Sequence, residues 1–217
     1  MEGLSMGTGD AAESVIDPDM VALFELFLGK EGSEHVMISS AEMAPRPQPY
    51  HYVVRDTEQK GLCLHNGQLV ATSLQGANAA QEGGCPGWGR GDTPTHGCSH
   101  PPHPPALLVE PISVVPNPYL ERRRCPLIVG IRGGTQALCC GTGPEPQLKL
   151  EEVGLLDLFS RAAEATPYTF YKTFGGSTHT FEAAAFPGRF LSTAPEPGQA
   201  LALAAPPAIT AFYLRRK

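Results

Sequence analysis

The sequence predicts an all-β domain of short antiparallel strands. From Tyr50 onward, short apolar segments alternate with turn residues. The 217 residues include 24 Gly and 22 Pro, so turns are frequent. Only residues 151–165 of this part have a helical pattern, which excludes a doubly wound sheet with alternating helices. A closed or capped antiparallel architecture is expected, and the pattern alone leaves a barrel, a sandwich and a trefoil open.

The first part of the chain, residues 1–46, is acidic and poorly patterned, and we expect a mostly disordered extension with one short helix. Asp17 can cap this helix and Pro18 suits its first position. Gly29 or Gly32 can end it. Its apolar side chains are Met20, Leu23, Phe24 and Phe27. A Pro-rich linker, APRPQP, follows. The extension is either a propeptide or a frayed end, and the sequence leaves both open.

Twelve candidate strands make up the remainder of the chain. They are residues 51–55, 62–65, 68–72, 112–115, 126–131, 136–140, 147–150, 168–172, 178–183, 189–193, 200–204 and 209–214. Asn66-Gly67 predicts a tight hairpin because both residues tolerate a positive φ, and Gly133-Gly134 gives the same signal. About one helical turn is expected between Leu155 and Phe159.

The charge balance argues against nucleic acid and membranes as partners. Charged residues make up 18% of the chain and the net charge is −6, so no basic footprint is present. The two basic runs, residues 122–124 and 215–217, are interpreted as solvated surface. No apolar run approaches the roughly 20 residues that a membrane-spanning helix needs. We therefore expect no nucleic-acid partner and no membrane insertion.

The N-terminus does not resemble a secretory leader, because acidic residues precede its apolar stretch and Glu25 interrupts it. A leaderless chain would fold with its six Cys reduced, and their spacing is no disulfide framework. Cys63 and Cys139 are interpreted as small apolar strand residues.

Catalytic and metal-binding patterns are missing as well. The sequence contains no G-x-S-x-G, no H-E-x-x-H and no phosphate-binding glycine loop followed by Lys, so we expect a non-enzyme without a cofactor. The spacing of one Cys- and His-rich segment matches no structural zinc site, and no metal is expected. Its candidate ligands are Cys85, His96, Cys98, His100 and His103.

The most specific motif is FEAAAFPGRFLSTAPEPGQAL, residues 181–201. It has an aromatic residue, small residues, a Pro, an apolar pair, Ser-Thr and a later apolar position at fixed spacing. This pattern resembles the C-terminal signature of the interleukin-1 cytokine family. Two positions depart from it, because Ala183 replaces a usual Ser and Arg189 replaces a common Trp. Residues 55–82, 112–159 and 168–188 are similar to the receptor-antagonist branch of the same family. The resemblance implies a β-trefoil of twelve strands in three pseudo-repeats over residues 47–217.

One block, residues 83–109, interrupts the resemblance. It is rich in Gly, Pro, His and Cys and has no strand pattern, and its removal restores the family's spacing by joining Glu82 to Glu110. We interpret it as an extra translated segment that emerges as a low-order loop. Arg90-Gly91-Asp92 within it is too short a motif to indicate integrin binding.

The family resemblance also implies a function. Such a protein is a monomeric cytokine that is held in the cytoplasm, leaves the cell without a leader and binds an interleukin-1-type receptor ectodomain. The family's receptor contacts fall on Arg55, Gln59, Ser73, Gln75 and Tyr213. The Gln residues and the Tyr match the family, whereas Arg55 and Ser73 replace other residues. The large aromatic anchors are therefore missing, which favours a receptor of the interleukin-36 type.

Several functional alternatives remain at this stage. The ending ITAFYLRRK favours an antagonist over an agonist of the interleukin-36 type. A trefoil lectin usually repeats a Q-x-W motif, whereas Trp88 is the only Trp in the chain. A heparin-binding growth factor would be strongly basic. Both of these classes are weaker alternatives than a cytokine.

Overall fold

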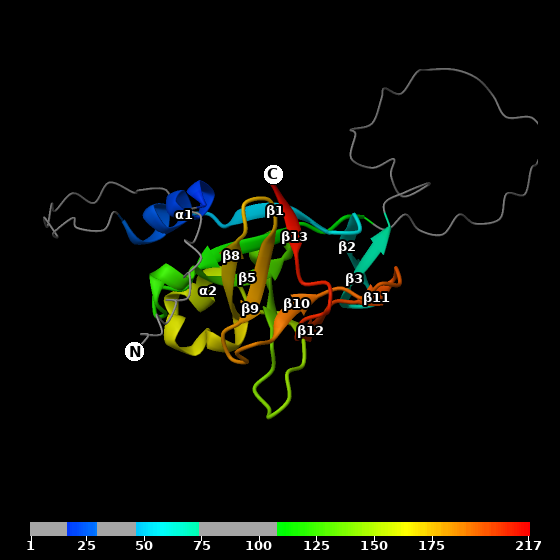
Figure 1. Cartoon of the computed structure of the whole chain (residues 1–217). Helices are drawn as coiled ribbons and strands as arrows, with labels where there is room; N and C mark the ends of the chain where they lie inside the picture. Colours follow the sequence, from blue (N-terminus) through cyan, green and yellow to red (C-terminus); the bar gives the residue numbers. More distant parts are fainter. Residues whose placement is uncertain (1–16, 30–46, 74–107) are drawn as a thin grey trace, which may run out of the picture.

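The computed structural model describes residues 17–29, 47–73 and 108–217 (Figure 1). Their strands divide into three lobes along the chain. The first lobe contains β1 (Tyr50–Asp56), β2 (Lys60–His65), β3 (Gln68–Ser73) and β4 (Ile112–Pro116). The second contains β5 (Pro126–Ile131), β6 (Gln136–Cys139), β7 (Lys149–Glu151) and β8 (Thr169–Phe174). The third contains β9 (His179–Ala183), β10 (Phe190–Ser192), β11 (Gln199–Ala200), β12 (Ala202–Ala204) and β13 (Phe212–Arg216).

Six of these strands close a barrel. Antiparallel pairing runs from β1 to β13, β9, β8, β5, β4 and back to β1. The hairpins β2–β3, β6–β7 and β10–β12 extend from one end of it, one from each lobe. A closed six-stranded barrel with three hairpins is a β-trefoil, and the expected fold is confirmed. Closure leaves the six barrel strands without a free edge.

The strand predictions are confirmed, with several ends shifted by one or two residues and two larger differences. The segment expected at 200–204 divides into β11 and β12, because β11 pairs with β3 whereas β12 pairs with β10. The last strand begins at Phe212 rather than at residue 209. Ile209 instead forms a single bridge with Thr193. Periodicity along the chain cannot anticipate such changes of partner, because register is decided by the neighbouring strand.

Local predictions about turns and cysteines also agree with the structure. Asn66 and Gly67 have φ angles of 49° and 77°, as a tight hairpin between β2 and β3 requires. The helical turn in the second lobe is α2 (Leu155–Ser160), and short 3₁₀ turns surround it. Cys63 and Cys139 are buried in β2 and β6, which confirms their interpretation as small apolar strand residues.

The interior is filled by apolar side chains of all three lobes. Phe170, Phe181 and Phe212 are at most 1% exposed, and the rings of Phe181 and Phe212 lie 6.3 Å apart. They come from β8, β9 and β13. Burial of such a side chain contributes about 1.5–3 kcal/mol, so this aromatic centre is a main source of stability.

The helix in the extension, α1 (Pro18–Leu28), forms as predicted. The Asp17 carboxylate accepts a hydrogen bond from the backbone N–H of Asp19 at 3.1 Å, and Pro18 starts the helix. Gly29, with φ 76°, ends it and donates its N–H to the Glu25 carbonyl at 2.9 Å. The sequence did not predict that this helix packs on the barrel. Figure 1 shows it beside the start of β1.

The surface that α1 covers is one end of the barrel. By the antiparallel register, β1, β5 and β9 start at this end, and β4, β8 and β13 finish there. We call it the barrel mouth, and it lies opposite the three hairpins. Met20, Leu23 and Phe24 of α1 are buried in the same cluster as the barrel core. The Phe27 ring contacts the ring of Phe159 in α2 at 5.1 Å, edge to face.

Two sequence interpretations fall mainly outside the described residues. Of the block 83–109, only Leu108 and Val109 are described, and Val109 forms a single bridge with Cys63. The Cys- and His-rich segment and the Arg90-Gly91-Asp92 tripeptide lie in the remainder. Neither described helix is long and apolar enough to cross a membrane.

Candidate functional site

The strand register places two of the sequence-predicted site residues side by side. Arg55 of β1 lies directly opposite Tyr213 of β13. Their neighbours Val54, Asp56 and Phe212 point inward and are at most 3% exposed. Because side chains alternate along a strand, Arg55 and Tyr213 share the outer face, and directly paired residues have Cβ atoms about 5 Å apart. Tyr213 is 40% exposed.

Gln59 lies in the turn that follows β1. Its φ is 65°, and its backbone N–H donates to the Asp56 carbonyl at 3.0 Å. The Asp56 carboxylate accepts hydrogen bonds from the backbone N–H groups of Glu58 at 3.0 Å and Lys60 at 2.9 Å. An Asp side chain that bonds the backbone two residues on defines such a turn locally. The exposed Gln59 side chain is thereby presented from a fixed backbone.

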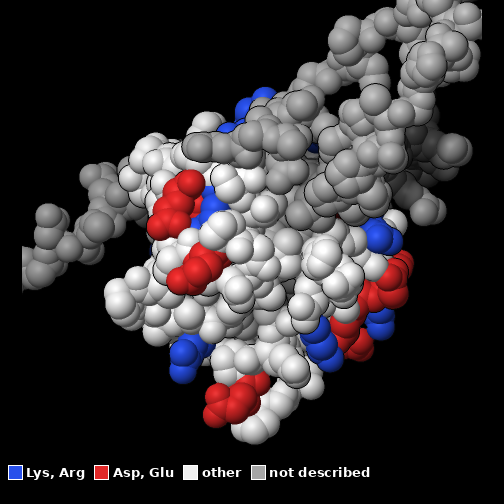
Figure 2. All heavy atoms as spheres, turned by 90° about the vertical axis from the view of Figure 1, so that its right-hand side faces the viewer, with Lys and Arg blue, Asp and Glu red and all other residues white. Residues whose placement is uncertain are grey.

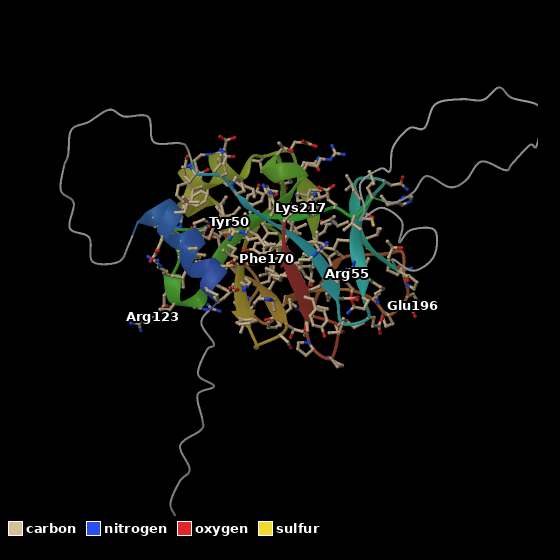
Figure 3. All side chains as sticks on the ribbon, turned by 90° about the horizontal axis from the view of Figure 1, so that it is seen from above. Tyr50, Arg55, Arg123, Phe170, Glu196 and Lys217 are labelled. Atoms are coloured by element: carbon tan, nitrogen blue, oxygen red, sulfur yellow. The ribbon has the colours of Figure 1, made fainter. Side chains whose placement is uncertain are left out.

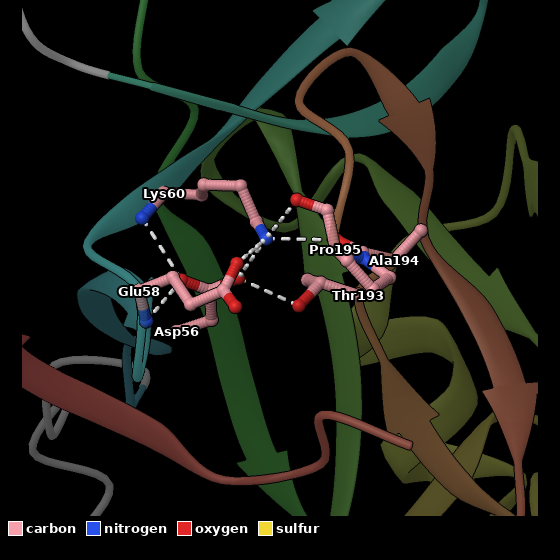
Figure 4. Close-up of polar contacts among 6 residues, drawn as sticks. All are labelled: Asp56, Glu58, Lys60, Thr193, Ala194 and Pro195. Atoms are coloured by element: carbon pink, nitrogen blue, oxygen red, sulfur yellow. Dashed lines mark hydrogen bonds and ion pairs between the residues drawn. The ribbon is translucent and has the colours of Figure 1, made fainter.

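A buried lysine fixes this turn to the third lobe (Figure 4). The Lys60 side chain is 4% exposed, and its ammonium donates to the carbonyls of Ala194 and Pro195 at 2.7 and 3.2 Å. It also contacts the carboxylates of Glu58 at 2.5 Å and Asp56 at 3.2 Å. Burial lowers the pKa of Lys60, but these two carboxylates outweigh it, and the net pKa is raised. The ammonium therefore stays charged and bridges two segments far apart in sequence.

The family signature contributes to the same network. The Thr193 hydroxyl donates to the Asp56 carboxylate at 2.6 Å, and both groups are buried. The other signature residues Phe181, Leu191 and Ser192 are at most 5% exposed. The departure at Arg189 falls in an exposed turn. The signature thus has a structural role, because it packs the third lobe and anchors the β1–β2 turn through Thr193.

The remaining predicted site residues lie close by or outside the described part. Ser73 ends β3 and pairs with Lys60, the first residue of β2. Arg55, Gln59, Ser73 and Tyr213 are therefore brought to one region, which we call the β1–β13 face. Gln75 lies outside the described residues.

Sequence reasoning missed the residues that support this face, namely Asp56, Lys60 and Thr193. A signal was present, because Asp56 and Lys60 flank a polar turn between two apolar strands. Their partner lies more than 130 positions away, however, and no local pattern connects them. Only the closure of the barrel shows that they belong together.

The face is shallow and carries positive charge. Val53, Arg55, Tyr213, Leu214 and Arg215 line a depression of about 330 Å³ that is open to solvent. It presents two guanidinium groups, one phenol ring and aliphatic carbons. Arg and Tyr, together with Trp, are the residue types that most often dominate protein interfaces.

The described residues contain no cluster of three or more His, Cys, Asp and Glu side chains that could hold a metal. Burial raises the pKa of the Cys125 thiol to about 11 and that of Cys140 to about 12. Thiols with such pKa values are poor nucleophiles near neutral pH.

Known proteins similar to this chain decide its family. The chain is 35% identical over 170 residues to the human interleukin-36 receptor antagonist protein, covering 75% of this chain and 92% of the relative. It belongs to the interleukin-1 family of cytokines. The family model for interleukin-1 and interleukin-18 matches residues 112–214. Human interleukin-1 family member 10 is 32% identical over 178 residues, covering 80% of this chain and 99% of the relative. The human interleukin-1 receptor antagonist protein is 31% identical over 199 residues, with 89% and 93% covered.

Solved structures of interleukin-1 cytokines share the fold. Chicken interleukin-1β aligns with a TM-score of 0.56 and 25% identity, covering 77% of this chain and 96% of that one. An NMR structure of interleukin-36α aligns with a TM-score of 0.52 at 21% identity, which supports the trefoil alone. Cytokines of this family act outside the cell, and the family predicted from the signature is confirmed.

Proposed function

We propose that this cytokine binds the ectodomain of an interleukin-1-type receptor through the β1–β13 face and blocks signalling. The observation that carries the proposal is the direct pairing of exposed Tyr213 with Arg55 next to the anchored Gln59 turn. Ser73 lies at the edge of the same region, and Gln75 follows it in the sequence. A Tyr ring on a fixed strand anchors an interface at low entropic cost, since it has few rotatable bonds.

The antagonist assignment is supported by the relatives and by the last strand. Two of the relatives above are named receptor antagonists, one for interleukin-36 and one for interleukin-1. The C-terminal segment ITAFYLRRK carries the Phe-Tyr pair that resembles the antagonists' ending. Arg55 stands where an aromatic anchor is usual, which supports a receptor of the interleukin-36 type over the interleukin-1 receptor.

The remaining properties follow from this function. A receptor ligand of this kind acts as a monomer, has no catalytic role and needs no cofactor. We propose that it is held in the cytoplasm and released without a leader. Figure 2 shows acidic and basic side chains interspersed on one face, among much uncharged surface. That face lacks the continuous basic field that heparin or an anionic membrane needs.

The test is a panel of reporter cells, each carrying one receptor of the family. The full chain and the same chain beginning at residue 47 are added alone and together with the receptor's agonist. The proposal expects blockade without activation at one receptor. Activation would instead assign an agonist of the interleukin-36 type. Retention on heparin or on a glycan array, without receptor binding, would assign a growth factor or a lectin.

Domain organisation suggests two further experiments. We propose that residues 1–46 act as a propeptide that is trimmed near Pro45 or Arg46, in the Pro-rich linker. Equal receptor affinity of the full chain and of the chain beginning at residue 47 would remove this role. We also propose that residues 83–109 are an insertion outside the trefoil core. Its deletion should leave the unfolding midpoint unchanged or raised, and a drop of several degrees would contradict this.

A further inference from the structure

The barrel mouth brings together two basic runs that are far apart in the sequence. Arg122–Arg124 form the 3₁₀ turn η2 before β5, and Arg215–Lys217 end the chain at β13. Lys172 of β8 lies at the same end of the barrel. Figure 3 shows Arg123 beside α1, and shows Tyr50 nearer to α1 than Arg55 at the other end of β1. The receptor-binding proposal uses Arg215 but leaves Arg122, Lys172 and Arg216 unused.

Acidic groups of the α1 segment meet these cations. The Asp17 carboxylate accepts from the Lys172 ammonium, whose side chain is only 2% exposed. The Asp19 carboxylate accepts from the Arg216 guanidinium at 3.4 Å. Arg122 completes the contact, since its guanidinium lies 5.5 Å from the centre of the Phe24 ring. An ion pair with a buried partner is sensitive to the loss of either charge.

Apolar side chains of α1 also pack closely against the barrel. Leu23 is fully buried, and Met20 and Phe24 are at most 5% exposed. They join a cluster that includes Tyr52 of β1, Ile112 of β4 and Cys125 before β5. Two other apolar side chains of the same helix are exposed, Val21 at 42% and Leu26 at 52%. Charge and shape therefore both specify which face of the helix binds.

We propose that the barrel mouth is a binding site for an acidic amphipathic helix, and that α1 is its tethered ligand. All contacts above join residues 17–29 directly to residues 47–217. A cut within residues 30–46 breaks none of them, so α1 stays bound as a separate, non-covalent chain. After a cut in the linker, α1 therefore still covers the barrel mouth. The mouth becomes exposed only when α1 dissociates. A tether only raises the local concentration of its ligand.

The experiment uses the full chain with a specific protease site replacing residues 36–41. After complete cleavage, the sample is diluted to about 1 µM and separated by size-exclusion chromatography and native mass spectrometry. The proposal expects the N-terminal fragment to travel with the trefoil in a 1:1 complex. Separation of the two fragments in the unmutated chain overturns it. No receptor enters this assay, so its outcome is independent of the proposed function.

Two matched substitutions test the specificity of the contact in the same cleaved chain. Leu23→Asp places a charge on the bound face and should weaken fragment retention at least about tenfold. Leu26→Asp makes the same change on the exposed face and should leave retention unchanged. Equal behaviour of the two variants contradicts the proposal. Hydrogen exchange of residues 19–28 in the uncut chain reports the same contact without relying on the variants, with protection expected and free exchange overturning it.

Discussion

The two ends of the β1–β13 strand pair differ in how their charges are satisfied. At the Tyr52–Arg216 end, α1 supplies Asp19 to the guanidinium, and the Arg216 side chain also lies over the Tyr50 ring at 3.7 Å. At the other end, Arg55 and Tyr213 lie on the outer face, above a buried network. One end thus contacts α1, whereas the other is the end that we propose to bind the receptor. The predictions below test whether the two ends have these different roles.

The largest effect should come from the network below the open end. Asp56→Ala removes the acceptor of Thr193 and of two backbone N–H groups, and it weakens the pairing of a buried ammonium. The free energy of unfolding should fall by about 3–5 kcal/mol, as when one partner of a buried pair is lost. Denaturant unfolding followed by circular dichroism measures it.

Glu58→Ala is the matched control for that change. Its carboxylate contacts the same ammonium but is 49% exposed, so its loss should cost less than about 1 kcal/mol. Equal losses from the two variants would mean that the buried network does not anchor the turn.

At the covered end, Leu23→Ala should cost about 2–4 kcal/mol, because a fully buried side chain is removed from the contact between α1 and the barrel. Leu26→Ala, on the exposed side of α1, should cost less than about 1 kcal/mol. Thermal unfolding of the full chain compares them. If both variants unfold like the unmutated protein, α1 contributes nothing to stability.

Acidification should also act at the covered end. Burial, followed by the neighbouring Lys172 ammonium, lowers the pKa of His179 to about 4, although Asp17 and Asp19 oppose this. The unfolded chain therefore binds a proton between pH 6.5 and 4 that the folded chain does not, and stability falls as the pH drops through this window. The loss is on the order of 2 kcal/mol after screening is allowed for.

Carboxylates also titrate in this range. The prediction therefore concerns the difference in pH-dependent stability between the unmutated chain and a His179 variant. His179→Gln should remove part of the pH dependence between pH 6.5 and 4 in urea titrations. Identical pH profiles would show that this imidazole is not responsible.

The smallest effect expected is on receptor binding by Gln59→Ala. One hydrogen bond contributes about 1 kcal/mol, so affinity should fall by about fivefold while the unfolding midpoint stays unchanged. Surface plasmon resonance with the receptor ectodomain measures it. A loss of affinity above a hundredfold would instead indicate that the substitution disturbs the whole turn.

Sequence reasoning went furthest where information is local. The Asn66-Gly67 hairpin, the α1 cap at Asp17 and the strands were predictable because periodicity and turn chemistry act over a few residues. The site residues came from family resemblance rather than from any pattern of their own.

The support beneath the site was not predictable for the same reason. Lys60 bonds to carbonyls at residues 194 and 195, and Asp17 reaches Lys172, so each contact depends on barrel closure. The basic runs were interpreted as solvated surface, yet Arg122 and Arg216 contact α1. The partner of a charged run cannot be predicted from the sequence, because the fold decides which groups lie beside it.

The most direct measurement is a receptor titration that compares two exposed tyrosines. Tyr213 lies on the β1–β13 face, whereas Tyr119, which is 66% exposed, lies between β4 and η2. Each is changed to Ala, and circular dichroism verifies that both variants are folded. Tyr213→Ala should weaken binding to the receptor ectodomain by about 1–3 kcal/mol, as expected for an interface anchor, and Tyr119→Ala should leave it unchanged. Unchanged affinity in a folded Tyr213→Ala variant would contradict the assignment of this face to the receptor.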